Sequence, residues 1–298
     1  MSQDWLATLA HKADLRERAG LRRELRPRAP EDRLIDLAGN DYLGLSRHPD
    51  ILSASAKALF EYGLGAAGSR LVCGSTTAHA ELEESLAAWL GTHAALVFSS
   101  GYLANLGAVR ALTQPRTLVV SDAHNHASLI DGIRATGAET VVTPHADVAA
   151  VAAALAAHPG RPALVVTESV FSVDGDLADL PALHEVTRRH GALLLVDDAH
   201  AAGLLGPAGA GGVAAAGLTG EPDVVVTATL SKAFGAAAGV VAGPEQLIAH
   251  LVDTGRTFIF DTALPPAVAT GAHAALTVIR GPEGAALRAE LAARAATA

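Results

Sequence analysis

Residues 193–197 have the sequence Leu-Leu-Leu-Val-Asp, a short apolar run that ends in a carboxylate, and a second run, Val-Val-Val-Thr-Ala, follows at 224–228. Continuous runs of this length, without alternation of polar residues, are typical of strands buried on both faces of a parallel sheet. Because an isolated carboxylate is costly to bury, we expect a cationic group to face Asp197. In such sheets, ligands bind outside the carboxyl ends of the strands, so the residues just after these runs are the first candidates for a functional site.

Short apolar runs and helical stretches alternate on both sides of residues 193–197. Further strands are expected at 95–98, 117–121, 140–143, 163–167 and 239–242. Helices are expected at 50–62, 78–91, 102–112, 127–136, 146–157, 180–190 and 244–253. This alternation predicts an α/β fold of three layers, with a mostly parallel sheet covered by helices on both faces.

The two ends of the chain have different patterns. The first thirty residues suit a surface helix that ends at Pro27 and Pro30, followed by a short strand over 33–38 and a turn at 39–42. Residues 283–298 have a helical pattern without a capping signal at its end, which is typical of an unfinished element.

Composition excludes several classes of protein. With 298 residues, 50% of them hydrophobic and 18% charged, the chain has ample material for a buried core, which excludes general disorder. The net charge of −9, with basic residues clustered only over 16–33, argues against a nucleic-acid partner. A single cysteine, no apolar run of about 18 residues and no secretory signal pattern predict a cytoplasmic protein with no membrane partner.

The stretch 63–68, Gly-Leu-Gly-Ala-Ala-Gly, has the G-x-G-x-x-G spacing of dinucleotide-binding loops. That motif requires a buried strand before it and a helix after it. Here a helical stretch precedes the glycines, and Ser69-Arg70-Leu71-Val72 follows them. We therefore favour a glycine-rich loop over a nicotinamide site.

Acidic and histidine residues gather in two places, Asp-Asp-Ala-His at 197–200 and His-Asn-His at 124–126. Carboxylates and imidazoles hold metal ions when their spacing allows it. The chain has 13 histidines, so close pairs also arise by chance, and no His-x-x-x-His helix accompanies them. We expect no metal site here.

A third set of residues explains more of the sequence at once. The strand at 224–228 leads into Thr-Leu-Ser-Lys-Ala-Phe-Gly at 229–235, and the chain has lysine only at positions 12, 57 and 232. Residues 97–102, Val-Phe-Ser-Ser-Gly-Tyr, read as a strand, a turn and a helix start, which is a natural phosphate cradle. A lysine amine, the Asp197 carboxylate and a phosphate-binding helix terminus are the groups that pyridoxal phosphate requires.

With these residues in place, the sequence resembles the fold-type I pyridoxal phosphate enzymes and, within them, the α-oxoamine synthases. The resemblance runs from about residue 15 to the end and rests on the stretches 39–45, 63–70, 122–129, 167–175, 197–200 and 229–235. It implies three parts: an N-terminal segment over 1–45, a large cofactor-binding domain over 46–282, and the start of a smaller C-terminal domain over 283–298. The rest of that smaller domain, which supplies an arginine for the amino-acid carboxylate in the family, is expected to be absent from this chain.

The resemblance also implies roles for individual residues toward the cofactor. Lys232 is expected to bond covalently to the cofactor and later to take the Cα proton, and Asp197 to pair with the ring nitrogen. His200 is expected to contact the phenolic oxygen of the ring, with Ser172 nearby, and His126 to stack on the ring and touch the substrate. The phosphate contacts it implies are Gly101, Tyr102 and Thr229, helped by a partner subunit.

For the substrates, the resemblance implies that Asn40 contacts the amino-acid carboxylate and that Arg22, or Arg23 beside it, contacts the acyl-CoA. Local structural roles are the alternatives for three of these residues. His126 could lie next to a helix cap, and Ser172 and Asn40 could form turns. One departure from the family pattern is Ala201, where glycine is usual after the histidine.

The implied activity is a decarboxylative condensation of L-alanine with pimeloyl-CoA, or with the acyl-carrier thioester, in a cytoplasmic homodimer whose active site lies at the subunit interface. Glycine with acetyl-CoA or succinyl-CoA, and serine with palmitoyl-CoA, are the alternatives within the family. A cofactor-binding domain without catalysis and a metal-dependent hydrolase are the alternatives from other classes.

Overall fold

The computed structural model describes residues 4–32 and 34–297. The chain divides into two compact units, Met1–Gly39 and Asn40–Ala298.

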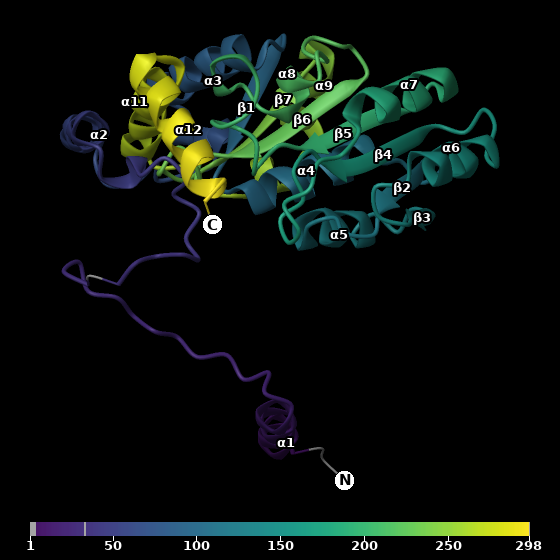
Figure 1. The fold of residues 1–298 in the computed structure, drawn as a ribbon, viewed down its shortest axis with the longest axis horizontal. Helices are drawn as coiled ribbons and strands as arrows, with labels where there is room; N and C mark the ends of the chain where they lie inside the picture. The colour runs from purple at the N-terminus through teal and green to yellow at the C-terminus, as the bar shows by residue number, and fades with distance from the viewer. Residues whose placement is uncertain (1–3, 33, 298) are drawn as a thin grey trace. The chain divides into compact units, whose positions relative to one another are not determined.

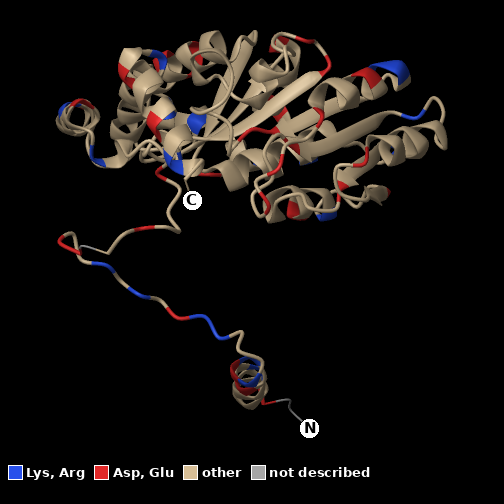
Figure 2. Ribbon diagram, in the orientation of Figure 1, with Lys and Arg blue, Asp and Glu red and all other residues tan. Residues whose placement is uncertain are grey.

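In the N-terminal unit, helix α1 (Trp5–Arg18) is capped by Asp4, whose side chain accepts hydrogen bonds from Leu6 N and Ala7 N. The expected helix to Pro27 is wrong: Gly20, with φ of 67°, turns the chain out of the helix, and α1 has no buried face to extend it. Charged residues of both signs are distributed along the following stretch to residue 32 (Figure 2).

The strand expected over 33–38 is also wrong for residues 34–38, which have no strand geometry. Residue 33, where that prediction began, lies outside the described residues. Within the part of the chain that the structure describes, no strand pairs with this segment, and a single unpaired strand is not stable.

The second unit is built on one sheet, with strands in the order β1-β7-β6-β5-β4-β2-β3 (Figure 1). β7 runs antiparallel to both of its neighbours, and the remaining pairs are parallel. Every strand expected from the alternation of residues 95–242 is present. The strands are β1 (Ala94–Phe98), β2 (Leu118–Asp122), β3 (Thr140–Thr143), β4 (Ala163–Glu168), β5 (Leu193–Asp197), β6 (Val224–Thr229) and β7 (Gly239–Gly243).

Helices cover both faces of the sheet, as predicted. One face carries α3 (Thr77–Leu90), α6 (Val148–Ala156), α7 (Leu180–His190) and α11 (Pro266–Arg280), with α2 (Pro49–Tyr62) and α12 (Pro282–Ala295) packed on α11. The other face carries α4 (Gly101–Leu112), α5 (Ala127–Arg134), α9 (Glu245–Thr254) and α10 (Arg256–Ile259). A short helix, α8 (Gly212–Ala215), precedes β6. None of the described helices has the length and apolar character needed to cross a membrane.

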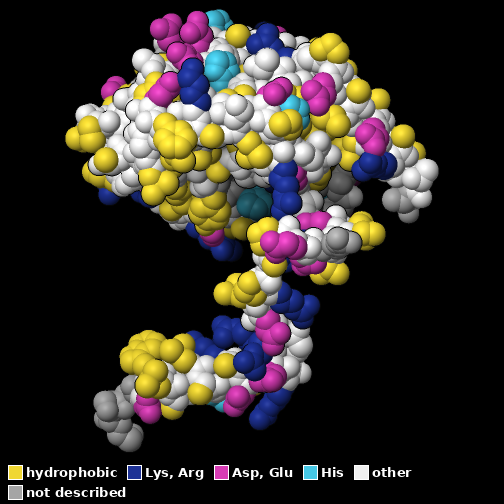
Figure 3. Space-filling model, turned by 90° about the vertical axis from the view of Figure 1, so that its left-hand side faces the viewer, with side chains coloured by type: hydrophobic (Ala, Val, Ile, Leu, Met, Phe, Trp, Pro, Cys, Tyr) yellow, Lys and Arg dark blue, Asp and Glu magenta, His cyan; other side chains and the backbone are white. Residues whose placement is uncertain are grey.

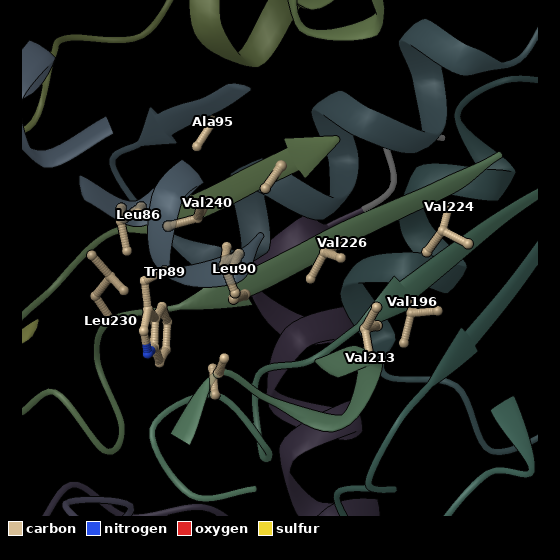
Figure 4. Packing of buried hydrophobic residues seen from close by; sticks show 14 of the residues in the cluster. Leu86, Trp89, Leu90, Ala95, Val196, Val213, Val224, Val226, Leu230 and Val240 are labelled. Carbon is tan, nitrogen blue, oxygen red and sulfur yellow. The ribbon is translucent and has the colours of Figure 1, made fainter. Parts of the chain in front are cut away.

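The core between β5–β7 and helix α3 fixes the strand ends that matter below. Val196, Val226 and Val240 come from these adjacent strands and belong to the same buried cluster as Trp89 on α3 (Figure 4). The Trp89 ring meets the edge of Phe234, with 5.5 Å between ring centroids. Since each fully buried large apolar side chain stabilises the fold by about 1.5–3 kcal/mol, the ends of β5 and β6 are held firmly.

The glycine-rich stretch 63–68 follows helix α2 and leads into a π-helical turn, Arg70–Gly74. In that turn Arg70 forms a largely buried ion pair with Glu83, with Nη1 and Oε1 2.8 Å apart. The strand–loop–helix context of a dinucleotide site is absent around this stretch, which agrees with the loop interpretation.

Candidate active site

A cavity of about 280 Å³ opens at the carboxyl ends of β4, β5 and β6, beside the N-terminus of α4. This is the edge of a parallel sheet at which ligands are expected. The cavity brings together most of the residues singled out from the sequence. It is lined by Ser100, Gly101, Tyr102, Asn105, His126, Ser128, Glu168, Asp197, Ala199, His200, Ala228, Thr229, Ser231 and Lys232.

Lys232 is placed by a tight loop between β6 and β7. Leu230 and Phe234 on either side of it are fully buried, and Gly235 N donates to Lys232 O at 2.9 Å. Gly235 has φ of 62°, and a Cβ there would lie 2.2 Å from Ser46 N, so only glycine fits this turn. The loop is therefore anchored on both sides while the amine faces the cavity.

A chain of hydrogen bonds leads from Lys232 to Asn40. The Lys232 amine lies 2.7 Å from His200 Nε2, and His200 Nδ1 lies 2.7 Å from the Tyr42 hydroxyl. The Tyr42 hydroxyl donates to Asn40 Oδ1 at 3.0 Å. This last bond uses the only proton of Tyr42, so His200 Nδ1 donates to Tyr42 and His200 Nε2 accepts from Lys232.

Both members of the Lys232–His200 pair are shifted toward their neutral forms. Burial lowers the pKa of Lys232, while Asp197 and Glu168 oppose that shift. Burial, followed by the charge of Lys232, lowers the pKa of His200 to about 4. His200 is thus a neutral acceptor for the lysine amine at pH 7.

Asp197 is 5% exposed and is held at the end of β5 by two donors. Its Oδ2 accepts from Asn105 Nδ2 at 2.7 Å, and its Oδ1 accepts from Ala199 N at 3.0 Å. Lys232 is the cationic group that lines the same cavity, and the Asp197 charge opposes the lowering of the Lys232 pKa by burial.

Glu168 is a cavity residue that we did not single out from the sequence. It ends β4 directly opposite Asp197 in the parallel register, and it is 2% exposed. Burial and then the charge of Asp197 raise the pKa of Glu168 to about 7. Its position in the sequence could have indicated this role. Glu168 comes directly after the expected strand 163–167, just as Asp197 stands at the end of the strand 193–197.

The N-terminus of α4 supplies an anion-binding end to the cavity. Ser100 caps this helix by accepting a hydrogen bond from Leu103 N at 3.3 Å, and Gly101 and Tyr102 form its first turn. A Cβ on Gly101 would lie 2.9 Å from the Cβ of Thr229, so the close approach of the helix to β6 requires glycine. The helix macrodipole and the free amide groups of such a first turn favour a phosphate.

His126 lines the cavity and also caps α5, since its Nδ1 accepts a hydrogen bond from Ser128 N at 3.2 Å. The capping interpretation and the cavity interpretation of this residue are therefore compatible. The preceding loop is tied down by Asn125, whose Nδ2 donates to Ser121 Oγ and to the carbonyl oxygen of Val166.

Three predicted site residues do not line the cavity. Ser172 touches it through Glu168, because its backbone N donates to Glu168 Oε2 at 3.2 Å. Asn40 is joined to it through Tyr42 and His200, a link between distant parts of the chain that no local pattern could indicate. Arg22 belongs to the N-terminal unit, where its Nη1 pairs with Glu17 Oε2 at 3.0 Å.

The acidic and histidine residues considered as a metal site are divided between the cavity and other surroundings. Asp198 is fully buried and bonds Ser169 Oγ at 2.5 Å and Gly212 N at 2.9 Å. His124 stacks on His145 instead, with 3.9 Å between the ring centroids. Of this set, Asp197 and His200 share the cavity with His126.

Comparison with known sequences gives consistent matches. Residues 32–298 match the model of the aminotransferase class I and II family. The 8-amino-7-oxononanoate synthase of Mycolicibacterium smegmatis is 57% identical over 282 residues, which cover 94% of this chain and 74% of that protein. The synthase of the same name from Mycobacterium avium is 56% identical over 275 residues, covering 92% of this chain and 72% of that protein.

Solved structures of two related enzymes match the fold. The serine palmitoyltransferase of S. paucimobilis, solved with bound pyridoxal phosphate and myriocin, has a TM-score of 0.83 and 32% identity, covering 93% of this chain and 73% of that one. The 8-amino-7-oxononanoate synthase of Francisella tularensis has a TM-score of 0.75 and 28% identity, covering 87% of this chain and 72% of that one.

Proposed function

Because the chain belongs to the aminotransferase class I and II family and is 57% identical to an 8-amino-7-oxononanoate synthase, we propose that it joins L-alanine to pimeloyl-CoA, or to the acyl-carrier thioester, in biotin biosynthesis. The products are 8-amino-7-oxononanoate, the free thiol and CO2. The observation that carries this proposal is the placement of Lys232, Asp197 and the α4 N-terminus around one cavity.

The residues of the cavity fit pyridoxal phosphate. The lysine amine provides the covalent attachment, the strand-end carboxylate suits a protonated ring nitrogen, and the first turn of α4 suits a phosphate. Gly101 keeps that turn open toward Thr229, where a side chain would fill the space. We therefore assign the phosphate to Gly101, Tyr102 and Thr229.

Pyridoxal phosphate, when bound, supplies an electron sink for the charge that develops at the Cα of an amino acid. Asp197 would keep the ring nitrogen protonated, so that the ring can accept this charge, and two hydrogen-bond donors hold the Asp197 carboxylate in place. Burial lowers the pKa of Lys232, which favours the neutral amine, and this neutral amine takes the Cα proton.

The acyl-transfer step forms a bond between the alanine Cα and the thioester carbonyl carbon, and the thiol leaves. Loss of the alanine carboxylate as CO2 then returns an electron pair to Cα, which is protonated. We assign the amino-acid carboxylate to Asn40, and the cofactor face and a contact with the substrate to His126. We assign the ring phenolic oxygen to His200, with Ser172 nearby on the cofactor. We assign the acyl-CoA to Arg22.

We also propose that the chain acts as a cytoplasmic homodimer. Large apolar side chains are exposed on α2 and on the segments that follow it in sequence, with Phe60 90%, Leu64 85% and Val72 83% exposed. Figure 3 shows hydrophobic side chains gathered on this side of the molecule. Apolar exposure of this kind marks a protein–protein interface, and a second copy of the chain is the occupant that we propose.

A comparison of amino-acid substrates tests the proposed function. The purified chain is incubated with pyridoxal phosphate, and thiol release from pimeloyl-CoA is followed with alanine, glycine or serine. We expect thiol release with alanine to be the fastest, and none from Lys232→Ala. The matched control is Lys12→Ala, because Lys12 is exposed on α1 and does not line the cavity.

A faster reaction with glycine or serine would assign the chain to another α-oxoamine synthase activity. The structural match to a serine palmitoyltransferase makes serine with palmitoyl-CoA the alternative to compare. Cofactor binding without thiol release from any pair of substrates would indicate a cofactor-binding domain without catalysis.

A further inference from the structure

Two buried residues to which neither the sequence analysis nor the proposed function gives a role connect Asp197 to His126. Asn105, on α4, is 4% exposed, and Ser128, on α5, is fully buried. Asn105 Nδ2 lies 2.7 Å from Asp197 Oδ2 and 2.8 Å from Ser128 Oγ. Ser128 Oγ lies 2.7 Å from His126 Nδ1. The four side chains form one unbroken chain of hydrogen bonds along the cavity.

The orientation of the Asn105 amide is determined by its neighbours. The carboxylate oxygen of Asp197 can only accept, so the group that faces it is the NH2 of Asn105. The reverse orientation would place two oxygens 2.7 Å apart in a buried site, which is strongly unfavourable. The second proton of this NH2 then goes to Ser128 Oγ.

The direction of the remaining bonds follows from that orientation. Ser128 Oγ accepts from Asn105, so its own proton is free to be donated to His126 Nδ1. The backbone N of Ser128 donates to the same nitrogen at 3.2 Å. With two donors aimed at Nδ1, the imidazole proton of His126 belongs on Nε2.

We propose that Asn105 and Ser128 are positioning residues. Asn105 holds the Asp197 carboxylate by a hydrogen bond, and Ser128 keeps the proton of the His126 ring on Nε2. His126 then presents an N–H donor to the cavity that it lines. Such a donor suits an oxygen of the substrates, either the amino-acid carboxylate or the thioester carbonyl. This last step rests on the proposed function, whereas the assignment of the proton rests on the hydrogen bonds alone.

The proton position can be measured in the whole protein without substrate. The chain is produced with ¹⁵N-labelled histidine, and two-bond ¹H–¹⁵N correlation spectra at pH 7.5 distinguish the two ring nitrogens. The His126 signals are identified by their loss in His126→Gln. We expect the proton on Nε2, and a proton on Nδ1 would overturn the proposal whatever the enzyme's activity.

Ser128→Ala removes the shorter of the two donors to Nδ1. We expect a population of His126 with its proton on Nδ1, together with a fall in kcat on the order of tenfold. The matched control is Ser85→Ala, since Ser85 Oγ also bonds a histidine, His273 Nε2, at 2.9 Å and belongs to helix α3 outside the cavity. The control should change the His273 signals and leave kcat and His126 unchanged.

Asn105→Asp conserves the shape of the side chain. The new carboxyl group and Asp197 must share a proton, because two unprotonated oxygens 2.7 Å apart would repel each other, and the chain of bonds beyond it should reverse. An oxygen then faces Ser128, which donates to it, and His126 Nδ1 becomes the donor to Ser128 Oγ. We expect the His126 proton to move to Nδ1 and kcat to fall on the order of a hundredfold. Wild-type proton positions in both Ser128→Ala and Asn105→Asp would reduce Asn105 and Ser128 to packing residues and overturn the proposal.

Discussion

The carboxyl groups of Glu168 and Asp197 come from residues paired directly across β4 and β5, yet their surroundings differ. Both oxygens of Asp197 accept hydrogen bonds, from Asn105 Nδ2 and Ala199 N. Glu168 Oε2 accepts from Ser172 N, whereas Oε1 is buried without a partner in the described chain. Burial and the neighbouring charge of Asp197 raise the pKa of Glu168 to about 7, so Glu168 is largely protonated in mildly acidic solution.

Glu168→Gln should change the pH dependence of stability. Between pH 4.5 and about 7, an unfolded chain loses the Glu168 proton while the folded chain keeps it, so the free energy of unfolding of the wild type falls as pH rises. The variant lacks this contribution, which is at most about 3 kcal/mol. Urea unfolding from pH 5 to 8 measures it.

The expected result is that Glu168→Gln gains stability relative to the wild type as pH rises through this window and levels off above it. Glu185→Gln is the control, because Glu185 is exposed and pairs only with Arg189 on the same helix. Parallel curves for the wild type and Glu168→Gln would show that Glu168 ionises normally in the folded protein.

Asp197→Asn should retain the fold and lose the reaction. The amide keeps the size of the side chain but removes the negative charge that the proposed chemistry needs at the cofactor ring. We expect kcat to fall by at least about a thousandfold, or about 4 kcal/mol of transition-state stabilisation, with little change in melting temperature. Thiol release and thermal unfolding measure the two quantities. Turnover near that of the wild type would contradict the role assigned to Asp197.

Gly101→Ala should weaken cofactor binding. Its Cβ would lie 2.9 Å from the Cβ of Thr229, which forces the first turn of α4 away from β6. We expect Kd for pyridoxal phosphate to rise on the order of tenfold, as the turn no longer presents its amide groups correctly. Gly65→Ala is the control, since no atom lies within 4 Å of a Cβ at that position. Equal Kd values for both variants would refute the phosphate assignment.

Phe60→Asp should favour the monomer. Phe60 is 90% exposed on α2, so the aspartate costs little in an isolated chain but places a charge in the interface that we propose. Sedimentation velocity should show a dimer for the wild type and a shift toward monomer for the variant. Leu177→Asp serves as the control, because Leu177 is 63% exposed and lies outside the proposed interface of Phe60, Leu64 and Val72. A monomeric wild type would contradict the dimer.

The sheet, its helical layers and much of the cavity could be predicted because the responsible signals are local. Apolar runs such as 193–197 mark buried strands, and chemistry-bearing residues follow them directly in sequence. Helix α11 was not expected, since its buried positions include Ala269, Gly271 and Ala272, whose small side chains fit against α2 and α3 without a strong apolar pattern.

The contacts that could not be predicted join residues far apart in the chain. Tyr42 reaches His200, and Asn105 reaches Asp197, through single side-chain hydrogen bonds that leave no periodic signature. The strand prediction for 34–38 was wrong because strand formation also depends on a distant partner. The composition of this segment suits a strand, but no partner strand is paired with it in the described chain.

The visible absorption spectrum of the purified chain with pyridoxal phosphate, before and after borohydride, tests the assignment of Lys232 most directly. We predict a yellow wild-type protein whose band is removed by borohydride with permanent attachment of the cofactor, and no such attachment in Lys232→Ala. Lys12→Ala, on α1, should behave as the wild type. A wild-type spectrum that shows only free cofactor, or borohydride attachment that persists in Lys232→Ala, would contradict the site described here.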